Sequence, residues 1–214
     1  MSVMGSSTGR RGQIIFLNGT SSSGKSSIAG QLLLMLDPPH FHMSVDAING
    51  MRAKERTLEL DPAELTAVLA RTRAGFHRAV AGMAQAGNDV IVDHVLSEPW
   101  RLLDCLTVLA GYQVMFVGIH CSPAELDRRE RARADRQAGQ ARAQRRQVHA
   151  HGLYDIECDT TVASARDCAI RIKDYLDRGQ LPTAFDQLRS RLLTSHAAVP
   201  GPTQQTRPRD DQPR

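Results

Sequence analysis

Short apolar runs alternate along the chain with longer segments whose apolar residues recur every three or four positions. Continuous apolar runs are typical of strands buried on both faces, and we place strands within 13–19, 40–48, 88–95, 112–121 and 154–160. The helical spacing predicts helices over 24–36, 61–87, 97–111, 122 to about 150, 164–179 and 183–194. Five strands that each precede a helix predict a three-layer α/β sandwich with a five-stranded parallel sheet.

Residues with special backbone or capping properties mark the expected helix ends. Asp61 is an N-cap candidate followed by proline, Ser97 is expected to cap the next helix, and Ser122 followed by Pro123 opens the long polar helix. Glycines stand where three helices should close, at Gly87, Gly111 and Gly179.

The stretch "GTSSSGKSS" lies between the first predicted strand and its helix. The spacing Gly-x4-Gly-Lys-Ser is a complete phosphate-binding loop, because its glycines let backbone N–H groups turn toward an anion at a helix N-terminus. A Ser/Gly linker is excluded by the apolar residues on both sides. Lys25 is expected to face the outer phosphates, and Ser26 to bind Mg²⁺. The residues expected to hold the nucleotide are Gly19, Thr20, Ser21, Ser22, Ser23, Gly24, Lys25, Ser26 and Ser27.

Two aspartates follow predicted strands, at the sheet edge where the loop also lies. In α/β sheets the ligand sits beyond the carboxyl ends of the strands, so these residues should converge. Asp93 ends the third strand and is predicted to join Ser26 at the Mg²⁺, although an N-cap or loop aspartate would look the same. Asp46 ends the second strand and is predicted to accept the proton of an acceptor hydroxyl; the alternative is a turn aspartate.

The positive charge of the chain is concentrated in one segment. Between Arg128 and Arg146, eight arginines stand against Glu130 and Asp135. This local excess of six leaves about −2 for the rest of a chain whose net charge is +4, and only 4% of residues are aromatic. A nucleic-acid binder is therefore disfavoured.

Arg129, Arg133 and Arg136 share one face of the predicted helix. Arg133 and Arg136 are expected to be catalytic, as guanidinium groups of a lid (about 128–146) that closes over the phosphates, and Arg133 is also expected to bind the nucleotide. The alternative is a solvated charged helix.

The histidines and cysteines carry weaker signals. His94, His149 and His151 are interpreted as structural, with His94 also a candidate to line the pocket, and no His spacing predicts zinc. The four cysteines form no C-x-x-C pair, which indicates reduced thiols in the core of a cytoplasmic protein. No apolar run approaches the roughly 20 residues that span a bilayer.

Six segments together resemble chloramphenicol 3-O-phosphotransferase and its relatives over most of residues 13–177. They are "IIFLNGTSSSGKSSI", "SVDAI", "VIVDHVL", "VMFVGIHC", "RRERARADRQAG" and "VH…YDIECDTT". The resemblance implies an adenylate-kinase-like P-loop NTPase fold with a helical lid, and transfer of the γ-phosphoryl group of ATP to a hydroxyl. It also implies that Asp46 is the base and that Arg133 and Arg136 are lid arginines. Lys25 is expected to be catalytic from its place in the phosphate-binding loop.

The chain departs from this family at two places. Asp93-His94 stands where the known member has two successive acids, and residues 49–68 are charged, unlike an aromatic-lined antibiotic pocket. The resemblance implies that the acceptor is a chloramphenicol-like antibiotic or a related metabolite, and residues 49–68 are expected to shape the acceptor site. Two alternatives stay open: a sugar or nucleotide-sugar kinase of the zeta-toxin type, and a regulatory nucleotide-binding switch without an acceptor.

The expected division of the chain follows these segments. Residues 1–12 form a disordered arm, 13–180 the P-loop kinase domain, 181–195 a helical extension, and 196–214 a tail rich in proline, glutamine and charge. The expected partners are ATP and a small hydroxylated acceptor, with no nucleic acid and no membrane. Nothing in the sequence indicates the oligomeric state.

Overall fold

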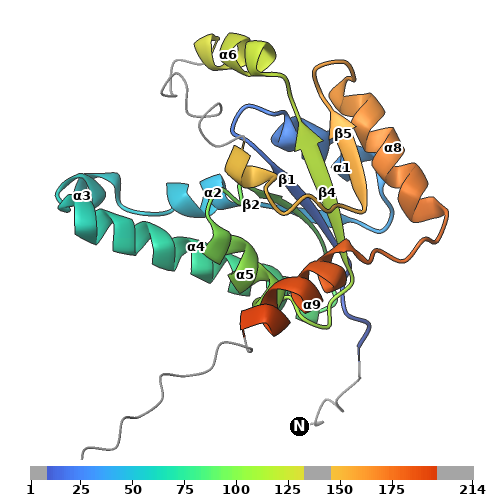
Figure 1. Ribbon diagram of the computed structural model, residues 1–214, viewed down its shortest axis with the longest axis horizontal. Helices are drawn as coiled ribbons and strands as arrows, with labels where there is room; N and C mark the ends of the chain where they lie inside the picture. Colours follow the sequence, from blue (N-terminus) through green and yellow to red (C-terminus); the bar gives the residue numbers. More distant parts are fainter. Residues whose placement is uncertain (1–8, 133–145, 197–214) are drawn as a thin grey trace, which may run out of the picture.

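A computed structural model describes residues 9–132 and 146–196. The strands are β1 (Ile14–Gly19), β2 (His40–Ser44), β3 (Asp89–His94), β4 (Val114–His120) and β5 (Ile156–Asp159). They form one parallel sheet in the order β2-β3-β1-β4-β5 (Figure 1). The predicted α/β fold with its five-stranded parallel sheet is confirmed.

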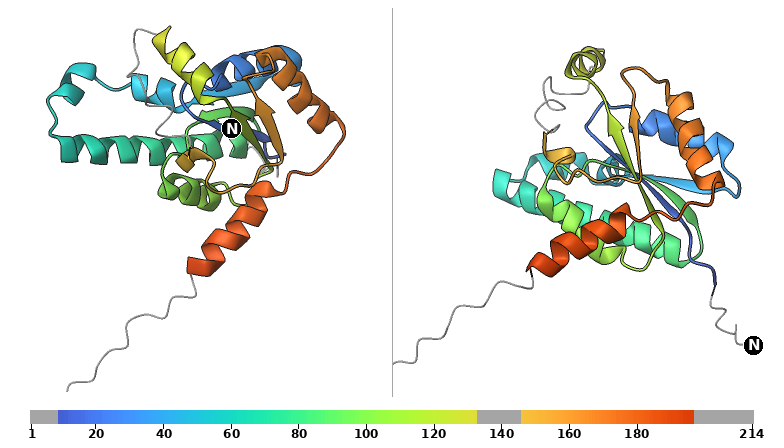
Figure 2. Two further views of the ribbon diagram at one scale, coloured as in Figure 1. Left: turned by 45° about the horizontal axis from the view of Figure 1, so that its top comes forward. Right: turned by 45° about the vertical axis from the view of Figure 1, so that its right-hand side comes forward.

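Helices cover both faces of this sheet, because its central strands are apolar on both sides. On one face lie α1 (Lys25–Met35) and α8 (Ala165–Asp177), whose Ile28 and Ile172 join the core beneath β1 and β4. On the other lie α4 (Pro62–Gln85), α5 (Pro99–Val108) and α9 (Ala184–His196), as the views in Figure 2 show. The three layers are those predicted.

The last helix contributes to the core of the sandwich. Phe185 of α9 packs its ring 6.0 Å from that of Phe16 and 5.3 Å from that of Phe116, measured between centroids. Aromatic pairs at these separations add to the stabilisation from burial alone. Residues 181–195, predicted as an extension, therefore include a helix that seals one face of the sheet.

Several predicted helix ends are confirmed by their caps. Asp61 and Glu64 form a capping box at the start of α4, and Ser122 caps α6 (Pro123–Arg131). The prediction for Ser97 is wrong. α5 begins at Pro99 with Glu98 as N-cap, and the Ser97 hydroxyl accepts a hydrogen bond from Arg101 instead.

The second strand is shorter than predicted. It ends at Ser44, whose side chain accepts a hydrogen bond from the N–H of Ala47 and so starts the short helix α2 (Val45–Gly50). Asp46 therefore lies in the first turn of α2 rather than at the end of β2, which corrects the sequence prediction. A further short helix, α3 (Lys54–Leu58), joins α2 to α4.

The helix predicted from 122 to about 150 is also too long. α6 ends at Arg131, because the N–H of Ala132 closes its last turn onto the carbonyls of Arg128 and Glu130. Residues 133–145, with Arg133, Arg136 and most of the predicted lid, lie outside the described residues. In Figure 1, α6 stands beyond the carboxyl end of β4.

All four cysteines are buried with free thiols, in agreement with their interpretation as core residues. Within the described ranges, no helix combines the length and apolar character needed to cross a membrane.

Candidate active site

The phosphate-binding loop curls at the carboxyl end of β1. Ser22 and Gly24 have positive φ angles of 60° and 95°, and Gly24 is the N-cap of α1. A Cβ on Gly19 would lie 2.5 Å from the carbonyl oxygen of Ile119, so this position requires glycine. The loop thus has the turn chemistry that its sequence predicts, and it leads directly into a helix N-terminus.

Lys25, Ser26 and Asp93 meet beside this loop. The Lys25 ammonium donates to the carbonyl of Thr20 at 2.7 Å and lies 3.7 Å from Oδ1 of Asp93. The Ser26 hydroxyl donates to Oδ2 of the same carboxylate at 2.5 Å. Burial alone would raise the pKa of Asp93, but the Lys25 ammonium, the His42 ring and the Ser26 hydroxyl outweigh it and lower the pKa to about 2. Asp93 is therefore ionised at neutral pH.

A small cavity of about 70 Å³ opens between the loop and α2. Asp46 and Asp93 both line it, together with residues of the loop. The tertiary structure therefore brings together the residues that we expected to converge at the carboxyl ends of the strands. The remaining residues of its wall include Ser21, Ser22, Gly24, Lys25, Ser26, Ser27, Ser44, Val45 and Val95.

The chemistry of this cavity fits a small, hard cation. The Ser26 hydroxyl and the Asp93 carboxylate supply oxygen atoms, which Mg²⁺ prefers. Within residues 9–132 and 146–196 there is no group of three or more His, Cys, Asp or Glu side chains able to hold a metal ion. A cation here would complete its coordination with water and phosphate oxygens.

A second cavity, of about 430 Å³, lies on the other side of Gly24. It shares Ser22, Gly24 and Ser27 with the first cavity. Its other residues come from α6 and its C-cap, from the segment after β5 and from the start of α8: Arg128, Arg129, Ala132, Thr160, Ala163, Ser164 and Ala165. The two cavities therefore adjoin along the phosphate-binding loop.

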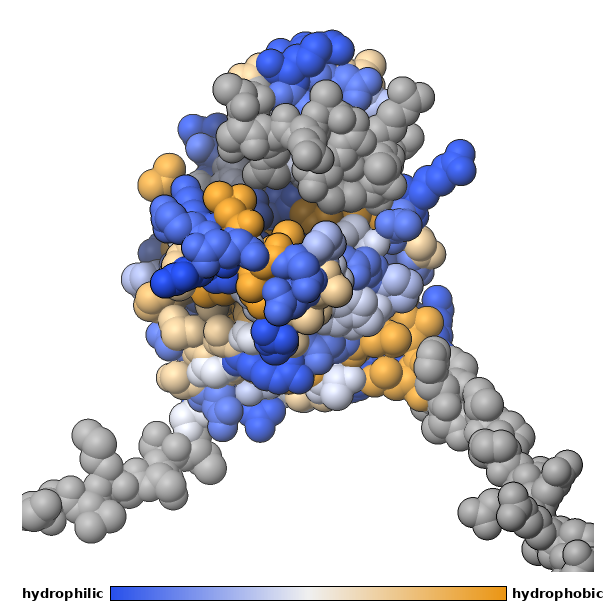
Figure 3. Space-filling view, turned by 90° about the vertical axis from the view of Figure 1, so that its left-hand side faces the viewer, coloured by the Kyte–Doolittle hydropathy of each residue, from blue (hydrophilic) through white to orange (hydrophobic). Residues whose placement is uncertain are grey.

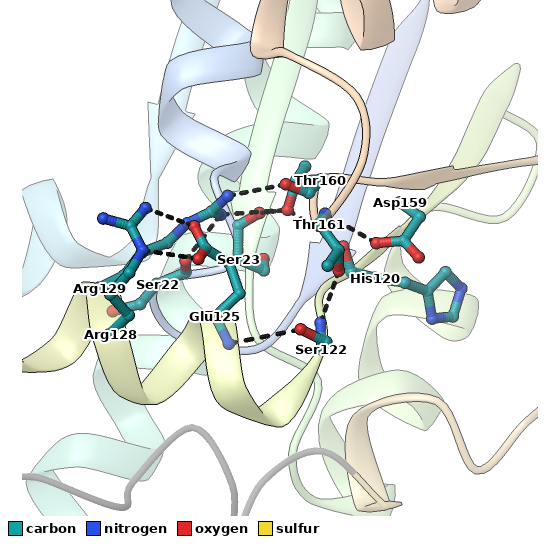
Figure 4. A network of polar contacts seen from close by, with 10 residues as sticks. All are labelled: Ser22, Ser23, His120, Ser122, Glu125, Arg128, Arg129, Asp159, Thr160 and Thr161. Atoms are coloured by element: carbon teal, nitrogen blue, oxygen red, sulfur yellow. Dashed lines mark hydrogen bonds and ion pairs between the residues drawn. The ribbon is translucent and has the colours of Figure 1, made fainter.

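Arg129 makes hydrogen bonds to α6, to the phosphate-binding loop and to the residue after β5 (Figure 4). Its Nε donates to Glu125 at 2.7 Å, its Nη1 to the carbonyl of Ser22 at 3.3 Å and to Oγ1 of Thr160 at 3.1 Å, and its Nη2 to the carbonyl of Thr160 at 2.8 Å. Thr160 in turn donates to the carbonyl of Ser23 at 2.8 Å. The sequence placed Arg129 on an arginine face, but only the fold connects it to the loop and to the end of β5.

The structure places His94 in the core. It is 1% exposed, and its Nε2 lies 3.1 Å from Nε2 of His77, whose Nδ1 pairs with Asp104 at 2.6 Å. Burial lowers the pKa of His94 well below its ordinary value, so the ring is neutral. His94 is absent from the wall of the loop cavity, in keeping with a structural role.

The other two histidines also make structural contacts. The Nδ1 atom of His149 lies 2.6 Å from the Tyr154 hydroxyl, and the His151 ring stacks on Phe116 with centroids 5.0 Å apart.

Sequence reasoning missed a set of arginines near Asp46. Arg101 of α5 is buried and donates to the carbonyl of Val95 at 3.0 Å, and Val95 lines the loop cavity. Arg52 follows α2 and donates to Thr72 of α4 at 3.4 Å, next to Arg73. One signal was available: Arg101 falls within the apolar stripe of α5, between residues that fill the core.

A family model described as "Chloramphenicol phosphotransferase-like protein" matches residues 12–177. The chain belongs to this family. A curated relative, "Putative O-phosphotransferase Rv2636" of Mycobacterium tuberculosis strain H37Rv, is 30% identical over 203 residues, which cover 86% of this chain and 90% of the relative. The family resemblance inferred from the six sequence segments is thereby confirmed.

Solved structures show the same fold at lower identity. The APS kinase CysC of Mycobacterium tuberculosis, solved in complex with AMPPNP and APS, has a TM-score of 0.57 at 19% identity and covers 78% of this chain and 98% of its own. The tunicamycin resistance protein of Deinococcus radiodurans has a TM-score of 0.58 at 18% identity, with 78% and 96% covered. The chain therefore has the P-loop kinase fold.

Proposed function

We propose that this protein is an O-phosphotransferase that moves the γ-phosphoryl group of ATP, with Mg²⁺, to a hydroxyl of a small molecule. One observation carries the proposal: the phosphate-binding loop and Asp46 line the same cavity. A carboxylate at that place can meet a hydroxyl beside the terminal phosphate. The relative named as an O-phosphotransferase supports the same reaction class.

The two adjoining cavities suit the two parts of a nucleotide. In the proposal the phosphates lie in the loop, where backbone N–H groups and Lys25 face them, and the base and sugar occupy the cavity beside Arg129 and Thr160. The Lys25 ammonium is held at the loop by Thr20 and Asp93, so its charge is in place before the nucleotide arrives.

Ser26 and Asp93 are the residues that would hold Mg²⁺. When bound, the cation neutralises phosphate charge and orients the phosphate oxygens. Asp93 is suited to this role because it is ionised and already lies within hydrogen-bond distance of Ser26.

Asp46 is proposed as the catalytic base. The acceptor hydroxyl gives its proton to the carboxylate while its oxygen bonds to the γ-phosphorus, and the bond from that phosphorus to the β,γ-bridging oxygen breaks to release ADP. Asp46 lies in the first turn of α2, in the wall of the loop cavity. Arg133 and Arg136 are proposed to neutralise the transferring group from the lid.

The decisive experiment compares Asp46→Asn with the wild type. We expect transfer of label from [γ-³²P]ATP to a panel of hydroxylated antibiotics, sugars and metabolites to fall by about 10²- to 10⁴-fold, the usual cost of losing a general base. ATP affinity, measured by calorimetry, should stay unchanged, since the loop is untouched. Glu55→Gln, at an exposed acid of α3, is the matched control.

Three results would contradict the assignment. Loss of ATP affinity in Asp46→Asn would place Asp46 at the metal. Unchanged transfer would make it a turn residue. ATP hydrolysis without transfer to any acceptor of the panel, unaltered by the substitution, would indicate a nucleotide-binding switch.

A further inference from the structure

Three arginines lie on the elements next to Asp46, beyond the residues that line the loop cavity. Arg52 follows α2, Arg73 lies in α4 and Arg101 lies in α5, so three separate elements contribute one each. Arg52 bonds to Thr72, the neighbour of Arg73, and Arg101 bonds to the carbonyl of Val95 in the wall of the loop cavity. We call Arg52, Arg73 and Arg101 the arginine cluster.

Arg73 is the member without a partner. It is half-buried, and within the described part of the chain it makes no hydrogen bond and no ion pair. The negative charges of Glu98 and Asp46 and the positive charge of Arg52 all act on it. Burial lowers the pKa of Arg73, and the like charge of Arg52 acts in the same direction. None of its nitrogen atoms is among the buried unpartnered polar atoms, so its five N–H donors reach solvent and are open to a ligand.

The other two arginines also keep unused donors. The Nε groups of Arg52 and Arg101 are buried without a hydrogen-bond acceptor, and the Arg101 side chain is only 9% exposed. Glu98, whose charge acts on Arg73, already accepts from Trp100 at 2.8 Å and from Arg101. The cluster therefore offers more donors and more positive charge than the described residues around it satisfy.

From this juxtaposition we infer that the arginine cluster binds a negatively charged group of the acceptor, so that the acceptor is an anionic alcohol rather than a neutral one. The inference rests on the proposed function and adds the substrate class to it. A carboxylate or phosphate at Arg73 takes up the unused donors and relieves the repulsion between neighbouring guanidinium groups. The hydroxyl of the same molecule then faces Asp46.

Figure 3 shows the end of the molecule formed by α3 and the adjoining part of α4, and hydrophilic side chains gather there between smaller apolar patches. Residues 49–68, which carry this end, were already unlike an aromatic-lined pocket in the sequence.

Trp100 provides a direct reporter for the test. It is the single tryptophan of the chain, it bonds to Glu98, and its ring lies 5.9 Å from the guanidinium carbon of Arg101. An anion that enters the cluster changes the charge beside the indole and hence its fluorescence.

The experiment uses the full chain saturated with AMPPNP and Mg²⁺, so that probes do not occupy the phosphate-binding loop. Matched probes are gluconate against sorbitol and shikimate against its methyl ester, with acetate and inorganic phosphate as minimal anions. We expect the charged member of each pair to bind at least about ten-fold more tightly than the neutral one by Trp100 fluorescence. Arg73→Gln should abolish this preference, and Arg71→Gln, at an exposed arginine of the same helix, should retain it.

A second readout separates a binding role from a structural one. Removing a structural arginine lowers the Tm of the ligand-free protein, whereas Arg73→Gln should leave the Tm unchanged or raise it, because an uncompensated charge is lost. Equal binding of charged and neutral probes, a preference that survives Arg73→Gln, or no anion that alters Trp100 in an Arg73-dependent way would each overturn the inference.

The proposed function is tested apart from this result. If anions bind through Arg73 but Asp46→Asn transfers phosphate normally, the base assignment fails and the anion site stands. If chloramphenicol or another neutral alcohol is phosphorylated as well as the charged probes, the reaction class stands and the anionic substrate class fails.

Discussion

The two sides of the phosphate-binding loop differ in how their arginines are used. On the side of α6, Arg129 has acceptors for its donors in Glu125, Ser22 and Thr160. On the side of α2 and α4, Arg73 has none among the described residues. Hydrogen bonds made within the protein hold a framework in place, whereas donors that face water are open to the acceptors of a ligand. Contacts within the protein therefore hold the arginine on the α6 side, whereas the arginine on the side of α2 and α4 is proposed to bond a ligand.

The largest effect is expected from Lys25→Ala, at the point that both sides share. Transfer should fall by about 10³-fold or more, because the ammonium that faces the outer phosphates is lost. The Arg73-dependent response of Trp100 to anions should persist, since the arginine cluster is untouched. The measurements are labelled phosphate transfer and Trp100 titration. Lys173→Ala, at a partly exposed lysine of α8 that pairs with Asp177, is the control.

Near-normal transfer by Lys25→Ala would show that the loop does not serve the phosphates. Loss of both responses together would show that the two sides are not independent.

An intermediate effect is expected from Arg129→Ala in the absence of any ligand. The substitution leaves the carbonyls of Ser22 and Thr160 without this donor, so the free energy of unfolding should fall by about 1–3 kcal/mol in a urea titration. Arg128→Ala is the matched control, because Arg128 is 68% exposed and bonds only to Glu125 among the described residues. Its effect should be within about 0.5 kcal/mol of zero.

Arg73→Gln, in contrast, is expected not to destabilise the ligand-free protein. Equal stability losses at Arg129 and Arg73 would remove the distinction between a framework arginine and a ligand arginine.

The smallest effect concerns the pH dependence of the free energy of unfolding. It arises at His151, which lines neither of the two loop cavities. His151 lies beside Asn18, at 3.4 Å, and stacks on Phe116. Burial lowers the pKa of His151 from 6.5 to about 4. Between these values the unfolded chain binds a proton that the folded chain does not. The contribution of the neutral His151 ring to the free energy of unfolding is therefore complete above about pH 6.5, and it is lost as the pH falls toward 4.

We expect His151→Gln to weaken this acid sensitivity. The loss of unfolding free energy between pH 7 and pH 4.5 should be about 1–3 kcal/mol smaller in the variant than in the wild type, since one pKa unit corresponds to about 1.4 kcal/mol. Urea titrations at the two pH values measure it. Identical pH dependence in both proteins would mean that His151 titrates normally in the folded state.

Local patterns predicted the framework of this protein well. Buried parallel strands read as continuous apolar runs, and the phosphate-binding loop carries its own turn chemistry, so β1, the loop and α1 follow from neighbouring residues. The meeting of Asp46 and Asp93 at one cavity also followed, because the carboxyl ends of parallel strands share an edge.

Errors arose where a few hydrogen bonds decide between local alternatives. Ser44 rather than Asp46 ends β2, because its hydroxyl starts α2. Ser97 bonds to a buried arginine instead of capping α5, because burial of Arg101 demands acceptors. Both choices depend on neighbours that the local sequence pattern does not identify.

The sheet, the family and the phosphate-binding loop follow from the amino-acid sequence alone, since these depend on periodicity and on motifs within short stretches. The network of Arg129 on one side of the loop, and the gathering of Arg52, Arg73 and Arg101 on the other, depend on how the chain folds. These three stand far apart along the chain and reach one site through the packing of α2, α4 and α5. The contribution of a charged side chain to stability or to binding depends on its burial and on its partners, and both are properties of the folded chain.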